Sequence, residues 1–154
     1  MILVNVALAA EPVLAVECAR AIHFATPYRW TWAADRPSID DATALVVRAD
    51  AELLRPRAVG GPVLYVGGWP AEVLWWSGDE ALVLAPVPVA DTVSAWFGSA
   101  QLPERVDAEH RKAEATAAAA IPPVSIQSRS ASLTWSGSRR ALVGVLQGWA
   151  DTCR

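Results

Sequence analysis

The chain has 154 residues, of which 53% are hydrophobic and 19% charged, so it can build one domain with a sizeable core, and global disorder is excluded. Its formal net charge of −3 argues against binding to nucleic acid or to an anionic membrane surface. The two cysteines, Cys18 and Cys153, show neither a disulfide-framework pattern nor a metal-ligand spacing. We therefore expect a protein of the reducing cytoplasm.

The N-terminal third predicts a strand, a helix and a second strand. Residues 2–8 form a β-rich apolar run, and because this run lacks a basic flank and is too short to span a bilayer, we interpret it as a core strand and expect no membrane insertion. Pro12 suits the first turn of a helix, and the apolar residues of 13–22 fall on one helical face. Aromatic and polar residues alternate over residues 28–33, which is typical of a strand.

The middle of the chain allows two interpretations. Residues 38–54 fit one long helix, but residues 43–47 also fit a buried strand with a short helix on either side, which we favour because β-branched residues cluster there. Further buried strands are expected at residues 62–66 and 81–84, with a short helix or strand at residues 70–76 and a helical stretch over residues 90–98. The alternation of strands and helices predicts an α/β fold with a doubly wound, five-stranded parallel sheet over residues 1–100.

Residues 101–154 are predicted to form a C-terminal extension made of a helix, a β-hairpin and a second helix. Residues 103–120 form the first helix, and residues 124–135 alternate in two registers, which suggests a hairpin that turns near Arg129. Ser136 or Ser138 can cap the last helix. Its apolar stripe consists of Leu142, Val145, Leu146 and Trp149.

Residues 78–87, Gly-Asp-Glu-Ala-Leu-Val-Leu-Ala-Pro-Val, align without gaps with the segment Gly-Ala-Asp-Asp-Tyr-Leu-Val-Lys-Pro-Phe of a response-regulator receiver domain. Residues 1–100 thus resemble a receiver, which has a flavodoxin-like fold. The resemblance implies a pocket at the carboxyl ends of the strands in which the reactive groups have been replaced. The residues of this degenerate pocket are Ala10, Glu11, Ala49, Asp50, Gly67 and Ala85.

Receiver phosphorylation needs acids that hold Mg²⁺, a nucleophilic carboxylate and a cation opposite them. Ala85 stands where the family has its lysine, and Gly67 stands where it has a hydroxyl, so we expect no phosphorylation, no catalysis, no cofactor and no metal site. Arg48 and Asp50 could close the pocket as an internal ion pair, or Arg48 could bind a small anion there. Cys18 and His23, five residues apart on one predicted helix, would point in different directions and form no thiol hydrolase site.

Degenerate receivers of this kind resemble the N-terminal pseudo-receiver of septum-site-determining and pilus-localisation proteins, which precedes an ATPase. No phosphate-binding GxxxxGK[ST] loop is present here, so the resemblance implies a recruiting or dimerising module whose partner is another protein or a second copy of the chain. Eight tryptophans are unusual, and those near the fourth and fifth strands are either core or interface residues. The candidate interface comprises Trp69, Trp75, Trp76, Trp96 and Phe97.

Two alternatives stay open. The chain could be a structural subunit of a larger assembly, such as a bacteriophage head or tail component. It could also be a small-ligand-binding α/β domain with its site at the strand carboxyl ends, where Glu11, Arg48, Asp50 and Gly67 would be the candidate residues.

Overall fold

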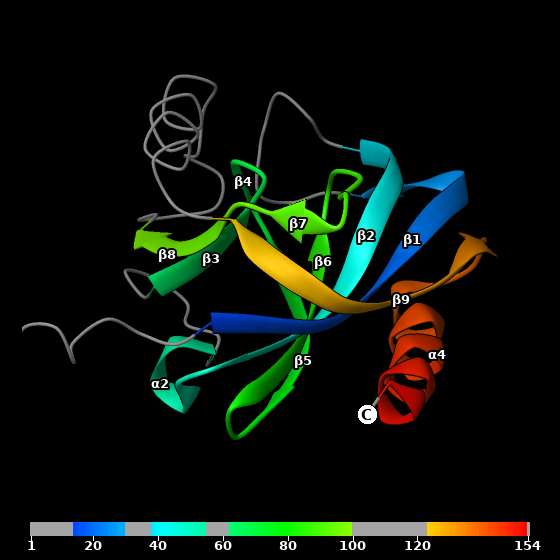
Figure 1. The fold of residues 1–154 in the computed structure, drawn as a ribbon. Coiled ribbons are helices and arrows are strands. Elements are labelled where there is room, and N and C mark those ends of the chain that lie inside the picture. Colours follow the sequence, from blue (N-terminus) through cyan, green and yellow to red (C-terminus); the bar gives the residue numbers. More distant parts are fainter. Residues whose placement is uncertain (1–13, 30–37, 55–61, 100–122, 154) are drawn as a thin grey trace, which may run out of the picture.

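The computed structural model describes residues 14–29, 38–54, 62–99 and 123–153, and these form nine strands and two helices (Figure 1). The helices are α2 (Ala51–Leu54) and α4 (Arg139–Thr152). The strands are β1 (Leu14–Arg29), β2 (Ser38–Ala49), β3 (Pro62–Val66), β4 (Trp69–Pro70), β5 (Glu72–Ser77), β6 (Glu80–Ala85), β7 (Thr92–Val93), β8 (Ala95–Ser99) and β9 (Val124–Trp135).

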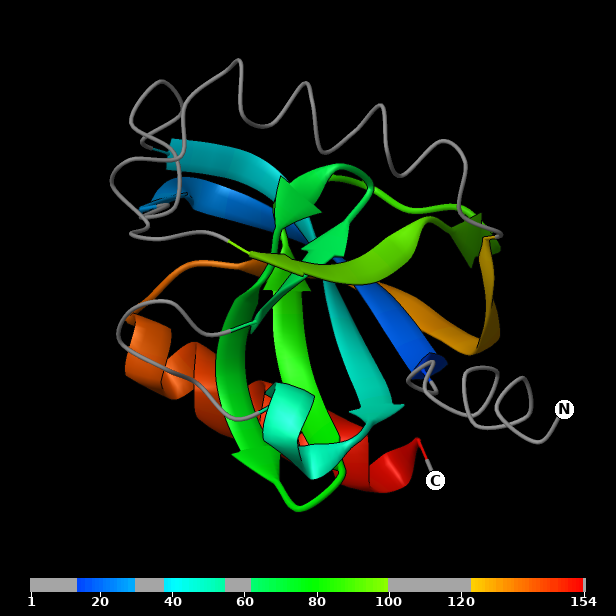
Figure 2. The same ribbon diagram turned by 90° about the vertical axis from the view of Figure 1, so that its left-hand side faces the viewer.

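The strands form two sheets, and α4 adds a third layer. The larger sheet has six strands in the order β5-β6-β2-β1-β9-β7, and the smaller has three in the order β4-β3-β8. Every pairing is antiparallel except that of β1 with β9, which is parallel. Figure 2 shows α4 behind the strands of the larger sheet and the smaller sheet in front of them.

Each face of the larger sheet has its own apolar core. Ala44 and Val46 of β2 pack with Leu142 and Leu146 of α4 in the first core, between sheet and helix. The intervening residues of β2, including Leu45 and Val47, pack in the second core, which Leu64 and Val66 of β3 close from the smaller sheet. The side chains of β2 and β6 alternate between the two cores because successive side chains of a strand point to opposite faces.

The predicted doubly wound parallel sheet is wrong, and with it the α/β class and the receiver-like architecture. β2 and β6 are neighbours, but they run antiparallel, with Thr43 opposite Ala85 and Arg48 opposite Glu80. The apolar runs at residues 43–47 and 81–84 do mark strands buried on both faces, as predicted. Such runs report burial on both faces and carry no information on strand direction, so an antiparallel sheet covered on both sides produces the same pattern.

The predicted helix over residues 13–22 is wrong from residue 14 onward, where β1 begins. Glu17 lies at a register shift of β1, because Val16 pairs with Val47 and Cys18 with Val46. The extra residue breaks the two-residue period of the strand. Val16 and Ala19 therefore face the second core although they are three residues apart, a spacing that imitates one face of a helix.

The predicted hairpin over residues 124–135 is also wrong, because β9 is one continuous strand. Its pairing with β1 shifts by one residue between Ser130 and Leu133, opposite Arg20 and Ile22. Val124 and Ile126 pack on the second core, whereas Leu133 and Trp135 pack on the first. The two apolar registers of the sequence are thus the two sides of this shift.

Other predictions have mixed outcomes. Of the two interpretations of residues 38–54, the strand is confirmed, as is the short helix after it, α2. The short helix predicted before it is wrong, because β2 already begins at Ser38. Residues 70–76 give strand β5, and residues 92–99 give β7 and β8, so the helical stretch predicted over residues 90–98 is wrong. The predicted first strand at residues 2–8 and the predicted helix at residues 103–120 lie outside the described residues.

The last helix is confirmed as α4, and its cap is Ser138, whose Oγ accepts a hydrogen bond from the Ala141 amide. Leu142, Leu146 and Trp149 are buried, but Val145 is 41% exposed, against its place in the predicted stripe. β9 and α4, which follow residue 100, complete the sheet and the first core of the residues before it. Among the described residues, neither helix is long and apolar enough to cross a membrane.

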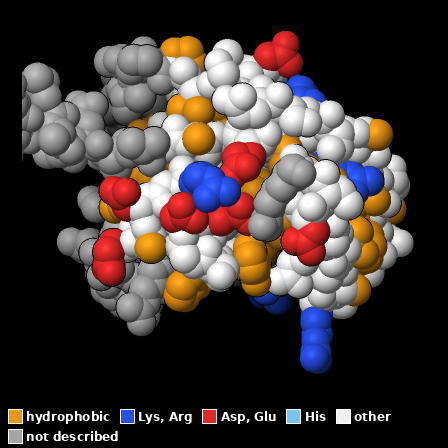
Figure 3. Space-filling view, turned by 60° about the horizontal axis from the view of Figure 1, so that its bottom comes forward, with side chains coloured by type: hydrophobic (Ala, Val, Ile, Leu, Met, Phe, Trp, Pro, Cys, Tyr) orange, Lys and Arg blue, Asp and Glu red, His pale blue; other side chains and the backbone are white. Residues whose placement is uncertain are grey.

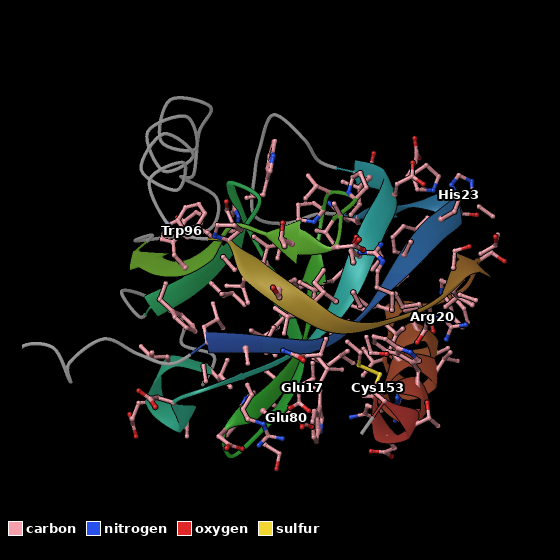
Figure 4. All side chains as sticks on the ribbon, viewed as in Figure 1. Glu17, Arg20, His23, Glu80, Trp96 and Cys153 are labelled. Carbon is pink, nitrogen blue, oxygen red and sulfur yellow. A yellow bond between two sulfur atoms is a disulfide. The ribbon has the colours of Figure 1, made fainter. Side chains whose placement is uncertain are left out.

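A disulfide joins Cys18 of β1 to Cys153 at the end of α4, across 135 residues of sequence (Figure 4). This bond corrects the interpretation that the two cysteines form no disulfide framework. Two cysteines so distant in the sequence have no spacing signal, and only the packing of α4 on the larger sheet brings them together. The bond fixes the C-terminal end of α4 to the strand at the centre of the fold.

Candidate functional site

The four described residues of the predicted degenerate pocket, Ala49, Asp50, Gly67 and Ala85, are not brought together. Ala49 ends β2, whereas Ala85, which ends β6, pairs with Thr43 six residues before Ala49. The two alanines are therefore about 20 Å apart along the strands. Asp50 is exposed and its carbonyl accepts from the amide of α2 residue Leu54, and Gly67 lies in the turn between β3 and β4. Ala10 and Glu11 lie outside the described residues.

The predicted interface residues come from both sheets. Trp69 and Trp75 are partly buried and pack against the first core. Trp96 stacks on Tyr65 with the ring centroids 5.1 Å apart, and both β8 aromatics, Trp96 and Phe97, are partly buried. Trp76 alone among the five is exposed, by 40%.

A pocket of about 550 Å³ lies where the far end of β1 meets β5, the end of β9 and the start of α4. We call it the aromatic pocket. Its volume lies in the range of small-molecule sites. It is lined by Phe24, Thr26, Pro27, Tyr28, Arg29, Glu72, Trp135, Gly137 and Arg139.

Aromatic rings form the apolar wall of this pocket. Phe24, which is buried, stacks against Tyr28 with the ring centroids 4.9 Å apart and the planes inclined by 29°. Trp135 adds a third ring, and like Tyr28 it packs against the first core. Stacked pairs of this kind are worth about 0.5–1.5 kcal/mol beyond the area they bury, so the wall is held in place before any ligand arrives.

The polar wall is a three-residue cluster from three elements. The hydroxyl of Tyr28 donates to Oε2 of Glu72 at 2.6 Å, and Nε of Arg139 donates to the same oxygen at 3.0 Å. The Glu72 side chain is only 12% exposed, whereas that of Arg139 is 53% exposed. A carboxylate this buried needs partners, and the phenol and the guanidinium supply them.

Burial, followed by the hydrogen bond to Glu72 and the negative charge of that residue, raises the pKa of the Tyr28 phenol well above its usual value near 10. Burial lowers the pKa of Arg139, but its hydrogen bond and ion pair with Glu72 outweigh that and raise it overall. Both groups therefore keep their protons at neutral pH. At neutral pH the phenol and the guanidinium therefore both serve as hydrogen-bond donors to Glu72.

The indole N–H of Trp135 is buried and has no hydrogen-bond partner in the described part of the chain. An unsatisfied buried donor costs about 1–3 kcal/mol. Gly137 lies against the same ring, since a Cβ built on it would come within 3.3 Å of Cζ2 of the indole, and its φ of 138° is one that other residues rarely adopt. Gly137 thus lets the chain pass close over Trp135 before α4 begins.

A second cluster surrounds Arg48 of β2 at the other end of the sheet. Its guanidinium bonds to Glu17 at 2.8 Å, to both carboxylate oxygens of Asp79 at 3.1 Å and to Glu80 at 3.3 Å. Figure 4 labels Glu17 and Glu80 at the lower end of the molecule, and Figure 3, with this end forward, shows acidic side chains around one basic group. Arg48 is therefore held by acids and does not form the predicted ion pair with Asp50.

A third cluster lies at the far end of the β1–β2 pair, where Figure 4 labels His23. Nδ1 of His23 lies 2.9 Å from Oδ1 of Asp41, and both side chains are more than half exposed. Ser38 and Ser132 line the same shallow pocket. Within the described part of the chain neither serine bonds to His23, so the histidine–aspartate pair has no positioned nucleophile and does not form a catalytic triad.

Sequence reasoning missed the aromatic pocket. Tyr28 and Glu72 are 44 residues apart, and Glu72 and Arg139 are 67 apart, so their contact depends on the sheet order and on the start of α4. One signal was available: Arg139 and Arg140 occupy the first turn of α4 without any acid, although that end of a helix favours negative charge. Two cations there indicate a use outside the helix.

The geometry of the site has to be interpreted on its own. Comparisons with models of protein families, with curated proteins and with solved structures found no match for this chain.

Proposed function

We propose that the protein is a non-catalytic binding domain whose ligand site is the aromatic pocket. The observation that carries this proposal is the pocket itself, which has a volume of about 550 Å³ and is lined by stacked aromatic rings and by a hydrogen-bonded polar cluster that share Tyr28. Concave sites with apolar walls and a few oriented polar groups are the usual form of a small-molecule site.

The chemistry of the wall supports binding over catalysis. The carboxylate of Glu72 already accepts two hydrogen bonds, and the raised pKa of Tyr28 keeps the phenol neutral at ordinary pH. The protonated phenol is not a general base near neutral pH, and Oε2 of Glu72 is engaged by both donors. The pocket therefore presents hydrogen-bonding groups that are already oriented.

The experiment is a fragment screen followed by two-dimensional NMR of the tryptophan indole N–H signals. The Trp135 signal is assigned with the Trp135→Phe variant, and Trp96, which lies on the smaller sheet and lines no part of the pocket, is the internal control. We expect planar apolar fragments to shift the Trp135 signal and to leave that of Trp96 in place. If no fragment at millimolar concentration moves Trp135, or if all indole signals move together, the proposal fails.

A second candidate is the interaction module predicted from the sequence, and the exposure of Trp76 on the edge strand β5 favours it. We take a second copy of the chain as the partner. Analytical ultracentrifugation should then show a concentration-dependent dimer for the wild type and a monomer for Trp76→Ser, with Val145→Ser as the matched control on α4. A wild type that stays monomeric excludes self-association, and a larger closed oligomer would instead favour the assembly subunit.

The disulfide provides an argument about the cellular compartment in which the protein is located. Disulfides that persist in folded proteins belong mainly to oxidising compartments and are rare in the cytosol. The bond between Cys18 and Cys153 therefore favours an oxidising compartment, while the cytoplasmic location stays a prediction from the sequence alone.

A further inference from the structure

The hydrogen-bonding groups of the aromatic pocket are unequally divided between donors and acceptors. Glu72 is the only carboxylate among the lining residues that the structure describes, and both of its bonds to the cluster end on Oε2. Arg139 donates to Glu72 through Nε, and its guanidinium also interacts with the Tyr28 hydroxyl, so no described carboxylate engages its terminal nitrogens. Arg29 also lines the pocket, and its side chain forms no ion pair within the described residues. The lining therefore offers more donors than acceptors.

The charge of the lining has the opposite sign to that of the protein. Among the described lining residues, two arginines and one glutamate give a formal charge of about +1, whereas the whole chain carries −3. The start of α4 reinforces this sign, because the helix dipole is positive at that end and Arg139 is followed by Arg140. An anion is the ligand that such a lining favours over a neutral or cationic one.

The aromatic residues of the pocket indicate the chemistry of the remaining, uncharged part of the ligand. The stacked residues Phe24 and Tyr28, together with Trp135, line the same pocket as Arg29 and Arg139. Aromatic faces and edges favour a planar ring as a partner. A guanidinium, in turn, matches the geometry of a carboxylate with two parallel hydrogen bonds.

We propose that the ligand of the aromatic pocket is a small aromatic carboxylate, with its ring against the aromatic wall and its carboxylate on the terminal nitrogens of Arg139 and on Arg29. Glu72 is a positioning residue in this arrangement, since its bond to Nε fixes the plane of the Arg139 guanidinium. This inference rests on the proposed function, because it names the ligand class for the same site.

The test compares 2-naphthoate with its neutral isostere 2-naphthamide, by isothermal titration and by the shift of the Trp135 indole signal. We expect the carboxylate to bind about tenfold or more tightly than the amide, as a charge-assisted hydrogen bond requires. Arg139→Gln should remove this preference. Arg140→Gln removes the same charge from the neighbouring residue, which does not line the pocket, and should change the affinity for 2-naphthoate by less than about threefold.

The outcomes separate the two proposals. Equal binding of 2-naphthoate and 2-naphthamide at Trp135 overturns the anionic ligand and leaves the binding pocket standing, as does a screen in which only neutral fragments bind. Equal weakening by Arg139→Gln and Arg140→Gln shows attraction by general charge and also overturns the assignment. Failure of every fragment to move Trp135 ends both proposals. Should Arg139→Gln lower the melting temperature, Arg29→Gln, outside the Glu72 cluster, carries the test.

Discussion

At the scale of the residue, Tyr28 makes the stability of the folded protein depend on pH. Its pKa is raised in the folded protein, so the unfolded chain loses this proton first as pH rises. The stabilisation from the protonated phenol is complete below the ordinary tyrosine pKa near 10, and it is lost as pH rises from there toward the folded-state value. Tyr28 therefore makes the folded protein less stable in alkali and has no such effect at neutral pH.

We expect Tyr28→Phe to flatten the alkaline end of the stability profile. Urea unfolding between about pH 8 and pH 11 should show the wild type losing stability above pH 10 faster than the variant, since phenylalanine has no proton to lose. At pH 7 the variant should be slightly less stable, because Glu72 loses one of its two donors. Parallel profiles for the two proteins would mean that Tyr28 has the same pKa in both states.

At the scale of the element, the apolar residues predicted to form one stripe of α4 differ in burial. Leu146 is fully buried in the first core, and its neighbour Val145 is 41% exposed. We expect Leu146→Ala to lower the free energy of unfolding by about 2–5 kcal/mol, since it leaves a cavity under the sheet. Val145→Ala should stay within about 0.5 kcal/mol of the wild type.

Chemical denaturation of both variants tests this difference directly. The two substitutions lie side by side in one helix, so a general effect on helix formation would appear in both. Similar losses for the two variants would contradict the packing of α4 on the larger sheet.

The elements also show what the sequence could predict. Local patterns made four elements predictable. Continuous apolar runs indicated the strands at residues 43–47, 62–66 and 81–84, and an apolar stripe with a period of 3.6 residues indicated the final helix. β1 and β9 were not, because an extra residue in each strand moves the apolar side chains from one face to the other. Neither the helix-like spacing of β1 nor the double register of β9 reveals that cause without the neighbouring strand.

The direction of the strands and the location of the site could not be predicted from the sequence either, because both depend on which strands are neighbours. Ala49 and Ala85 would be close in a parallel sheet, but the antiparallel pairing of β2 and β6 separates them. The residues that do meet, Tyr28, Glu72 and Arg139, come from three elements that only the complete sheet order places together.

At the scale of the whole molecule, the disulfide is the strongest single constraint that the described residues show. A disulfide typically stabilises a fold by about 2–4 kcal/mol, mainly by restricting the unfolded chain, and a loop as long as this one lies at the upper end, at about 5 kcal/mol. We expect reduction with dithiothreitol to lower the melting temperature by about 5–15 °C. The variant Cys18→Ala/Cys153→Ala should be insensitive to the reductant.

Mass spectrometry of the intact, unreduced protein provides the matching chemical check. The bonded form is lighter than the dithiol by two hydrogen atoms, and alkylation of the unfolded but unreduced chain should modify neither cysteine. Two free thiols in protein purified under oxidising conditions would contradict the pairing.

The same bond has a consequence for proteolysis. Because it joins positions 18 and 153, it closes almost the entire chain into a covalent ring. A protease that cuts once anywhere inside that ring releases no fragment, and the nicked protein would migrate as one band until a reductant is added. The disulfide therefore keeps a singly cut chain in one covalent piece, whichever loop within the ring is cut.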